Sequence, residues 1–560
     1  MTTHRRVGVV AARGRGASGL GTRISGLASY RGFRWLLRIM LIQFAVQVIS
    51  LCIIAPITVG TTSIALFDFT YYYVAALTLR LNPHANIYDP RIMPAIASTY
   101  HVPLSLSPGP FNYPLLLPIA LIPLSLFSFQ AASVIWYLFN LLLWALNIAL
   151  LSDWACHGLL GAQGGAASPK SPKSPMQGAL ARWRSLPDAA RFAIVLVLYL
   201  GLTYAPLIDA QILGQASMLM LTCFLLAQWF ERRGRPEIAG ALLIIPTFIK
   251  VFPAFLIAYY VVRGRWRVAV GAAVGGALAL VGMALVVGVG GILSMRGVLQ
   301  ASTAGVFQTF HNESLARAPL WIAVELGGAP SATTTALGDA LIALVALAIA
   351  AVWFATRRRA LYAQSHEHGH EQGDAAYLDY AWALTGMILI TPVTWDHYDI
   401  WLLPGIVFGL GYALRRLHHL RAERDAGAAG RAWPWRVAAL GLFAALLLTG
   451  SNLPLGYDGI PTLSPGPYLL GHLLRPFFML VRPLGALLVW LIIGAMYVRL
   501  PPASQPAAAA ETEEAAAGAG SISGVSWRLM YPLALGALVG PTAVRLLFEV
   551  IANMVSATPK

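Results

Sequence analysis

Residues 39–59 read IMLIQFAVQVISLCIIAPITV, a run without charged residues that follows eight arginines and no acid in residues 1–38. At about 20 residues, such a run is long enough to cross a bilayer as a helix and longer than the apolar core of a signal peptide. Cytoplasmic segments of membrane proteins are enriched in Lys and Arg. The run therefore predicts an uncleaved first transmembrane helix, with the arginines before it in the cytoplasm.

The composition of the whole chain extends this prediction. Of the 560 residues, 58% are hydrophobic and only 11% are charged, and the mean hydropathy is +0.67. A soluble protein carries roughly 25% charged residues, which it needs to cover its surface. The composition excludes a soluble enzyme, a disordered chain and a fibrous repeat, and it favours a multi-pass membrane protein. The three cysteines lie in or beside apolar stretches, so they predict no disulfide framework and no metal cluster.

The net charge of +16 gains its meaning from where the basic residues lie. After the N-terminal arginines, they recur in clusters at 170–191, 232–235, 263–267, 357–359 and 415–436. If every cluster is cytoplasmic, an even number of helices must cross the membrane between successive clusters. The surplus of positive charge therefore indicates topology, and we predict no nucleic-acid partner.

Two apolar runs do not fit a simple crossing. The run 114–129 is short and contains prolines, so we expect it to lie at the outer interface or to re-enter the membrane. The run 238–262 contains Pro246 and Pro253, so we expect two short helices that meet near Lys250.

The fold class is thus an all-α, polytopic membrane helix bundle of about 11–13 transmembrane helices. The other predicted spans are 39–59, 131–151, 192–204, 213–230, 268–293, 336–354, 377–390, 400–414, 435–448, 484–498 and 529–551.

Four regions are predicted along the chain. They are a basic cytoplasmic tail at 1–38, a membrane domain at 39–500 with an outer loop at 61–113, a flexible cytoplasmic linker at 501–528, and a final transmembrane helix and tail at 529–560. The segment HEHGHE at 366–371 follows a basic cluster on the cytoplasmic side. Because such tracts also bind metal adventitiously, we predict no dedicated metal site and no cofactor.

Under this topology the polar clusters fall on the outer side of the membrane. They are Asp68, Tyr72, Tyr88, Asn112 and Tyr113 in the first outer loop; Asp209, Gln211 and Gln215; Lys250; His311, Asn312 and Glu313; and Trp395, Asp396, His397 and Tyr398. An acid beside a helix end can be a solvated loop residue, and aromatic residues beside spans often form interface belts. Lys250 differs, because a charge in mid-membrane costs about 2.5–3.5 kcal/mol unless it is paired, functional or snorkels to the surface.

The combination of these residue types favours chemistry on lipid-linked sugars. A carboxylate can serve as a general base, and a Lys or Arg can stabilise a departing phosphate. Aromatic and amide side chains suit sugar faces and hydroxyls, and a groove between apolar helices suits a lipid tail. The sequence contains no Walker A loop, Rossmann fingerprint or HExxH motif, so the use of a soluble nucleotide is not supported.

Six segments carry a resemblance to a known family. They are Asp68-Phe-x-x-Tyr72, Asn82-Pro83 with Tyr88, Tyr113-Pro114, Lys250-x-x-Pro253, Asn312-x-Ser314 and Trp395-Asp396-His397. Over roughly residues 31–414 the chain resembles glycosyltransferase family 87, which contains polyprenol-phosphate-mannose-dependent mannosyltransferases and related arabinofuranosyltransferases. The family often has Tyr-Pro-Pro where this chain has Tyr113-Pro114-Leu115.

The resemblance implies an inverting, metal-independent membrane glycosyltransferase of the GT-C class. Its donor would be a polyprenyl-phosphate sugar, mannose by family frequency, and its acceptor a glycolipid or glycan hydroxyl at the extracytoplasmic face of the cell membrane. The catalytic acid of the family's first outer loop maps to Asp68. We expect the donor phosphate to be bound by Lys250, His311, Arg80 and Arg317. The candidates for substrate binding are Tyr72, Tyr88, Asn112, Tyr113, Gln211, Asn312, Glu313, Trp395, Asp396 and His397.

A transporter or flippase of lipid-linked sugars is the alternative function. It would also need polar groups inside a helical bundle, but it usually has internal repeats with broken helices in matching positions of two halves. The sequence has one broken helix, at 238–262, and no matching partner. A non-catalytic assembly protein is a weaker alternative, because it has little use for an acid, a His and a Lys on one face.

Overall fold

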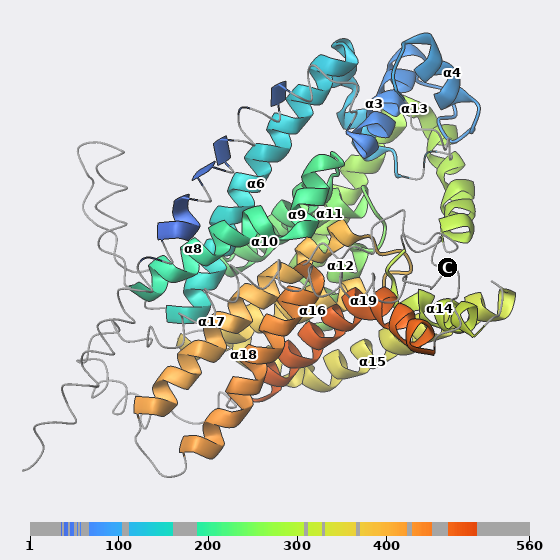
Figure 1. Ribbon diagram of the computed structural model, residues 1–560. Helices are drawn as coiled ribbons and strands as arrows, with labels where there is room; N and C mark the ends of the chain where they lie inside the picture. The colour runs from blue at the N-terminus through green and yellow to red at the C-terminus, as the bar shows by residue number, and fades with distance from the viewer. Residues whose placement is uncertain are drawn as a thin grey trace, which may run out of the picture.

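The computed structural model describes residues 66–103, 111, 113–160, 188–306, 312–326, 331–365, 370–422, 428–450 and 469–500, with scattered positions between 35 and 57. The described residues form helices and contain no β-strand (Figure 1). The elements are α3 (Phe67–Leu81), α4 (Ile92–Thr99), α5 (Leu116–Ala120), η2 (Ile122–Leu126), α6 (Phe129–Leu160), α8 (Asp188–Thr203), α9 (Ala205–Ile212), α10 (Ser217–Arg232), α11 (Pro236–Thr247), α12 (Ala254–Val262), α13 (Trp266–Val306), η4 (Leu315–Arg317), α14 (Ala318–Glu325), α15 (Ala332–Ser365), α16 (His370–Leu389), η5 (Asp396–Leu402), α17 (Leu403–Ala422), α18 (Ala428–Gly450) and α19 (Leu469–Val498).

The architecture confirms an all-α, multi-pass membrane protein. Within the described ranges, six helices are long and apolar enough to cross a bilayer, or seven if the bent pair α8 and α9 is one span. The six segments are Phe129–Leu160, Trp266–Arg296, Ala332–Arg357, His397–Leu420, Arg431–Gly450 and Leu480–Val498. The predicted first helix at 39–59 is described only at scattered positions. The tail at 1–34, the loop at 161–176, residues 366–369, the linker at 501–528 and the last helix at 529–551 lie outside the described residues.

Neither exception to simple crossing forms one long helix. The run 114–129 contains the short helices α5 and η2, neither long enough to span a membrane, and ends where α6 begins. The run 238–262 is divided into α11 and α12, and Lys250 lies in the turn between them. Pro246 lies inside α11, and Pro253 follows the break, where its ring disfavours a helical conformation of the residue before it.

The helices carry the basic and the polar clusters to opposite ends. Helix α10 begins near Gln215 and ends at Arg232, and α12 leads from the Lys250 turn to Arg263. At the basic end, Arg232 stacks on the ring of Tyr377 at 4.1 Å, and Arg415 donates to the carbonyl of His157. Because His157 packs on Tyr377 at 4.5 Å, Arg232 and Arg415 lie at the same end of the bundle.

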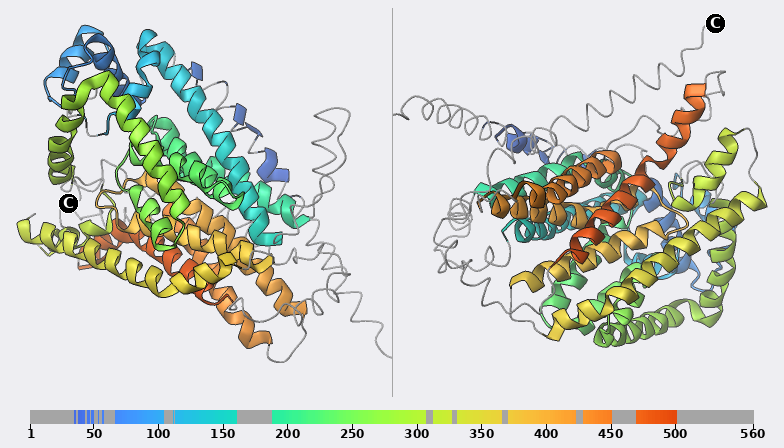
Figure 2. Two further views of the ribbon diagram at one scale, coloured as in Figure 1. Left: turned by 180° about the vertical axis from the view of Figure 1, so that it is seen from behind. Right: turned by 90° about the horizontal axis from the view of Figure 1, so that it is seen from below.

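Helices α11 and α13 approach closely because glycines lie at their contact. A β-carbon at Gly240 would lie 1.9 Å from the carbonyl oxygen of Val268, and one at Gly271 would lie 2.0 Å from that of Glu237. Small residues allow helix backbones to pack directly on one another in a membrane. Between Trp266 and Arg296 most side chains of α13 are apolar and exposed or half-buried, and the left view of Figure 2 shows this helix along the outside of the bundle.

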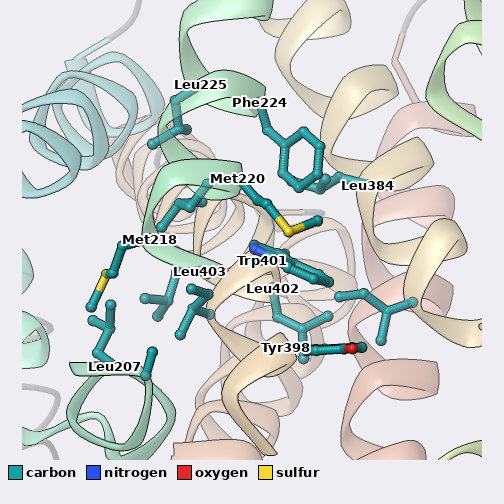
Figure 3. Packing of buried hydrophobic residues seen from close by; sticks show 14 of the residues in the cluster. Leu207, Met218, Met220, Phe224, Leu225, Leu384, Tyr398, Trp401, Leu402 and Leu403 are labelled. Atoms are coloured by element: carbon teal, nitrogen blue, oxygen red, sulfur yellow. The ribbon is translucent and has the colours of Figure 1, made fainter. Parts of the chain in front are cut away.

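The core beneath the polar clusters is aromatic. Trp401 of η5 packs edge-on against Phe224 at 5.7 Å and stacks on Tyr398 at 4.7 Å (Figure 3). Its indole nitrogen donates to the carbonyl of Ser217, so η5 is fixed to the start of α10. Tyr398 therefore projects from a rigid support.

Candidate functional site

Asp68 lies in the first turn of α3, where the helix dipole favours a negative charge. Its backbone N–H donates to the carbonyl of Leu213 at 2.9 Å, which joins α3 to the turn between α9 and α10. Phe69, the next residue, stacks on Trp136 of α6 at 5.4 Å. Three segments that are distant in sequence therefore fix the position of the acid.

The α9–α10 turn is pressed against α3 at Gly214. This glycine has φ +67, and a β-carbon there would lie 2.8 Å from Cβ of Leu66 and 2.9 Å from Cβ of Phe69. Its carbonyl accepts a hydrogen bond from the indole of Trp136 at 2.8 Å. Only glycine combines the left-handed backbone conformation with this close approach.

We expect Gly214→Ala to lower both the stability and the activity of the protein, because the added methyl group would force α3 and its acid away from the turn. Gly234→Ala is the matched control. Gly234 has nearly the same backbone conformation, φ +72, but nothing lies within 4 Å of its would-be β-carbon. The control should show only the backbone penalty, about 1 kcal/mol. Thermal unfolding in detergent measures both variants, and equal losses would contradict the role of close approach.

The residue after this glycine, Gln215, connects two predicted site residues. Its side-chain amide donates to a carboxylate oxygen of Asp68, and its amide oxygen accepts from the hydroxyl of Tyr72 at 3.2 Å. Gln215 and Tyr72 are both buried. A buried glutamine, itself fixed by the fold, therefore positions the carboxylate of Asp68.

Lys250 reaches the same group of residues from the α11–α12 turn. Its ammonium donates to the hydroxyl of Tyr398 and lies 4.0 Å from the centre of that ring. It also lies 5.4 Å from the ring of Tyr113, which packs edge-on against Tyr72 at 5.0 Å. We call Asp68, Tyr72, Tyr113, Gln215, Lys250 and Tyr398 the Asp68–Lys250 cluster.

The electrostatics of this cluster reflect burial. Burial, followed by the charge of nearby Asp68, raises the pKa of Tyr113, so its hydroxyl stays protonated at neutral pH. Burial lowers the pKa of Lys250, which lies outside the candidate spans, and the carboxylate of Asp68 opposes that shift. The carboxylate is thus near enough to the ammonium to affect its charge.

Other predicted residues of the first outer loop have different surroundings. Tyr88 donates to the carbonyl of Tyr113 at 3.1 Å and thereby positions that residue. Arg80 is exposed at the far end of α3, about 18 Å from Asp68 along the helix axis. Gln211 donates to the carbonyl of Tyr137 at 3.3 Å. Asn112 lies outside the described residues.

The predicted residues in the loop after α13 lie beside the segment that leads into η5. Asn312 accepts from the backbone N–H of Ser314 and of Thr394, so its side chain fastens the loop to the segment before η5. Glu313 accepts from Arg482 of α19 at 3.2 Å. Glu313, Arg482 and Asp399 line a cleft of about 250 Å³.

The remaining predicted residues lie around the start of the two short helices η4 and η5. Arg317 is buried, with its guanidinium 5.3 Å from the ring of Trp321. Trp395 precedes η5, and the buried ring of His397 packs edge-on against Tyr398 at 4.8 Å. His311 and the side chain of Asp396 lie outside the described part of the structure.

The sequence assigned no role to Gln215 or Tyr398, although both lie in its polar clusters. For Tyr398 the available signal is its place directly after the Trp-Asp-His segment. For Gln215 it is the glycine before it, which marks a turn at the start of an apolar helix. Neither signal reveals that the two residues contact Asp68 and Lys250.

The Asp68–Lys250 cluster contains one carboxylate and one ammonium, with tyrosine rings packed around them. A carboxylate can accept a proton, and a buried cation can stabilise charge on a departing oxygen. The described residues contain no group of three or more His, Cys, Asp or Glu side chains that could hold a metal ion.

Comparisons with known proteins identify the class of enzyme. Residues 111–367 match the model of glycosyltransferase family 87. The chain is 25% identical over 369 residues to the polyprenol-phosphate-mannose-dependent alpha-(1-2)-phosphatidylinositol mannoside mannosyltransferase of Mycobacterium tuberculosis, a match that covers 64% of this chain and 75% of that protein. No solved structure matches the chain. The family match and the relative confirm the resemblance seen in the sequence: the chain is a membrane glycosyltransferase similar, over residues 111–367, to glycosyltransferase family 87.

Proposed function

We propose that the protein transfers mannose from a polyprenyl-phosphate donor to a hydroxyl of a glycolipid at the outer face of the membrane, with inversion at the anomeric carbon. The observation that carries this proposal is the meeting of Asp68 and Lys250 in one cluster, although 182 positions separate them in the sequence. The donor and acceptor classes follow those in the printed name of the mycobacterial relative.

Each part of the cluster has a role in this reaction. Asp68 accepts the proton of the acceptor hydroxyl, whose oxygen then attacks the anomeric carbon from the side opposite the phosphate. The bond between that carbon and the phosphate oxygen breaks, and the electron pair leaves with the polyprenyl phosphate. Lys250 stabilises the charge on this phosphate as it departs. Tyr113, which is partly exposed, offers the sugar an apolar ring face and a hydroxyl, and the buried Tyr72 and Tyr398 support Tyr113 and Lys250.

The charge distribution supports the outer face. The cluster lies at the end of the bundle opposite Arg232, Arg263 and Arg415. Basic residues mark the cytoplasmic side of membrane proteins. The acid and the donor phosphate would therefore lie on the extracytoplasmic side, where the lipid-linked sugar presents its head group.

The test is a transfer assay with purified protein in lipid nanodiscs. Radiolabelled polyprenyl-phosphate mannose and a phosphatidylinositol mannoside acceptor should yield labelled glycolipid and an equal amount of released polyprenyl phosphate. The anomeric configuration of the new linkage, read by NMR, should be opposite to that of the donor. Retention of configuration would contradict the single-displacement mechanism.

The same assay separates an enzyme from a flippase. A flippase would move the labelled donor across the bilayer of a proteoliposome without releasing polyprenyl phosphate. Movement without release would overturn the proposed function, whereas release that depends on the acceptor would support it. The family match and the mannosyltransferase relative favour the enzyme.

A further inference from the structure

We infer that Gln215 is a positioning residue for the base: its amide orients the carboxylate of Asp68 and keeps it ionised. This inference rests on the proposed function, because it assigns Asp68 the role of proton acceptor. It is carried by two hydrogen bonds, from the Gln215 amide to Asp68 and from the Tyr72 hydroxyl to Gln215.

The orientation of the Gln215 amide follows from the chemistry of its neighbours. An ionised carboxylate can only accept hydrogen bonds, so the NH₂ group of the amide must face Asp68. The amide oxygen then faces Tyr72, whose hydroxyl can donate to it. Burial, the largest cause, raises the pKa of Tyr72 well above its ordinary value, so this hydroxyl keeps its proton. The direction of donation therefore runs from Tyr72 through Gln215 to Asp68.

The protein places Gln215 firmly enough to impose this orientation. Its side chain is only 2% exposed, and its backbone N–H donates to the carbonyl of Ala210 at 2.9 Å. The preceding Gly214 is pressed against the start of α3, and the backbone N–H of Asp68 donates to Leu213 of the same turn. The acid and the amide that faces it thus belong to one rigid junction.

This arrangement has a direct consequence for proton transfer. A hydrogen bond donated to a carboxylate stabilises its charged form and lowers its pKa. The donated bond also fixes the rotation of the carboxylate about its last side-chain torsion. Without the amide, Asp68 would hold its proton at higher pH and would face the acceptor hydroxyl less often. The loss should therefore appear in kcat and in the acid limb of the pH profile.

Two variants of nearly the same shape test this inference. Gln215→Met keeps the length and burial of the side chain but cannot donate, and Gln215→Glu replaces the donor with a second carboxylate. We expect kcat to fall about 10- to 100-fold in Gln215→Met, the loss that corresponds to one hydrogen bond to a charged group. The KM for the donor should stay the same. The acid limb of the kcat profile should move to higher pH, and it should move furthest in Gln215→Glu, because like charges raise the pKa of a carboxyl group.

Gln228→Met is the matched control. Gln228 is also a buried glutamine, 2% exposed, but it lies on α10 eleven residues after the helix begins, about 16 Å along its axis. Its substitution should leave the position of the acid limb unchanged. If Gln215→Met lowers activity but leaves the acid limb in place, Gln215 has only a packing role and the inference fails.

A variant of the acid separates the inference from the function on which it rests. If Asp68→Asn abolishes transfer while both Gln215 variants behave like the native protein, the inference fails and the proposed function survives. If Asp68→Asn retains full activity, the proposed role of the acid fails, and the role of Gln215 fails with it.

Discussion

Asp68→Asn is expected to lower kcat for mannosyl transfer by about 10²- to 10⁴-fold, the range typical for loss of a general acid–base group. Asparagine has almost the same shape, and its amide oxygen can still accept the hydrogen bond from Gln215. It cannot accept the proton of an acceptor hydroxyl. The variant should therefore fold and bind the donor while losing the chemical step. Steady-state transfer assays, with donor binding measured separately, test this prediction.

Asp89→Asn supplies the control for this loss. Asp89 lies in the same outer loop, but it pairs with Arg91 at 2.6 Å, and the side chain of that arginine is 86% exposed. Exposed ion pairs contribute little to stability, so this variant should keep nearly native activity. A comparable loss in both variants would mean that the outer loop tolerates no loss of charge. Full activity in Asp68→Asn, with a native unfolding temperature, would show that another group accepts the proton.

The break near Lys250 could be predicted from the sequence because it depends on one segment and its flanking clusters. The basic clusters needed an even number of crossings between them, and this requirement, with two prolines, predicted the break near Lys250. The structure places that lysine in the turn between α11 and α12. Asp68 became the candidate base because it is the first acid after the predicted first helix and because the resemblance places the family's catalytic acid there. Asp68 lies before residues 111–367, which match the family model, so only the structure shows that it lies beside residues of that segment.

Contacts between distant side chains could not be predicted in the same way. Gln215 and Asp68 lie 147 positions apart, and Lys250 and Tyr398 lie 148 positions apart. No local pattern relates such pairs. Asn312 is a different case. Its place in a polar outer loop suggested a substrate contact, and in the structure its side-chain oxygen accepts hydrogen bonds from two backbone N–H groups. A polar residue type alone does not distinguish these uses, because a buried amide needs partners in either case.

Lys250→Met is expected to lower kcat by about 10²- to 10³-fold, the range for losing one group that stabilises a developing negative charge. Methionine fills the space of the lysine stem and needs no polar partner. It should therefore be accepted at this site, where Lys250 is only 8% exposed. The KM for the acceptor should change little, because Lys250 acts on the leaving phosphate. Arg267→Met, which removes an exposed cation from the basic end, is the control and should retain full activity.

The pH dependence of transfer gives a second and independent test of Lys250. Burial lowers the pKa of this lysine, and Asp68 only partly opposes the shift, so the positive charge is lost at a lower pH than for an ordinary lysine. In the free enzyme, kcat/KM for the donor should therefore be high below that pKa and fall as the pH rises through it. Lys250→Arg keeps its charge at every accessible pH. We expect this variant to be less active at neutral pH, because the planar guanidinium fits the site poorly, but to lose the alkaline limb. An alkaline limb that stays in place in Lys250→Arg would have to come from another group, and Lys250 would then not be the cation that the departing phosphate requires.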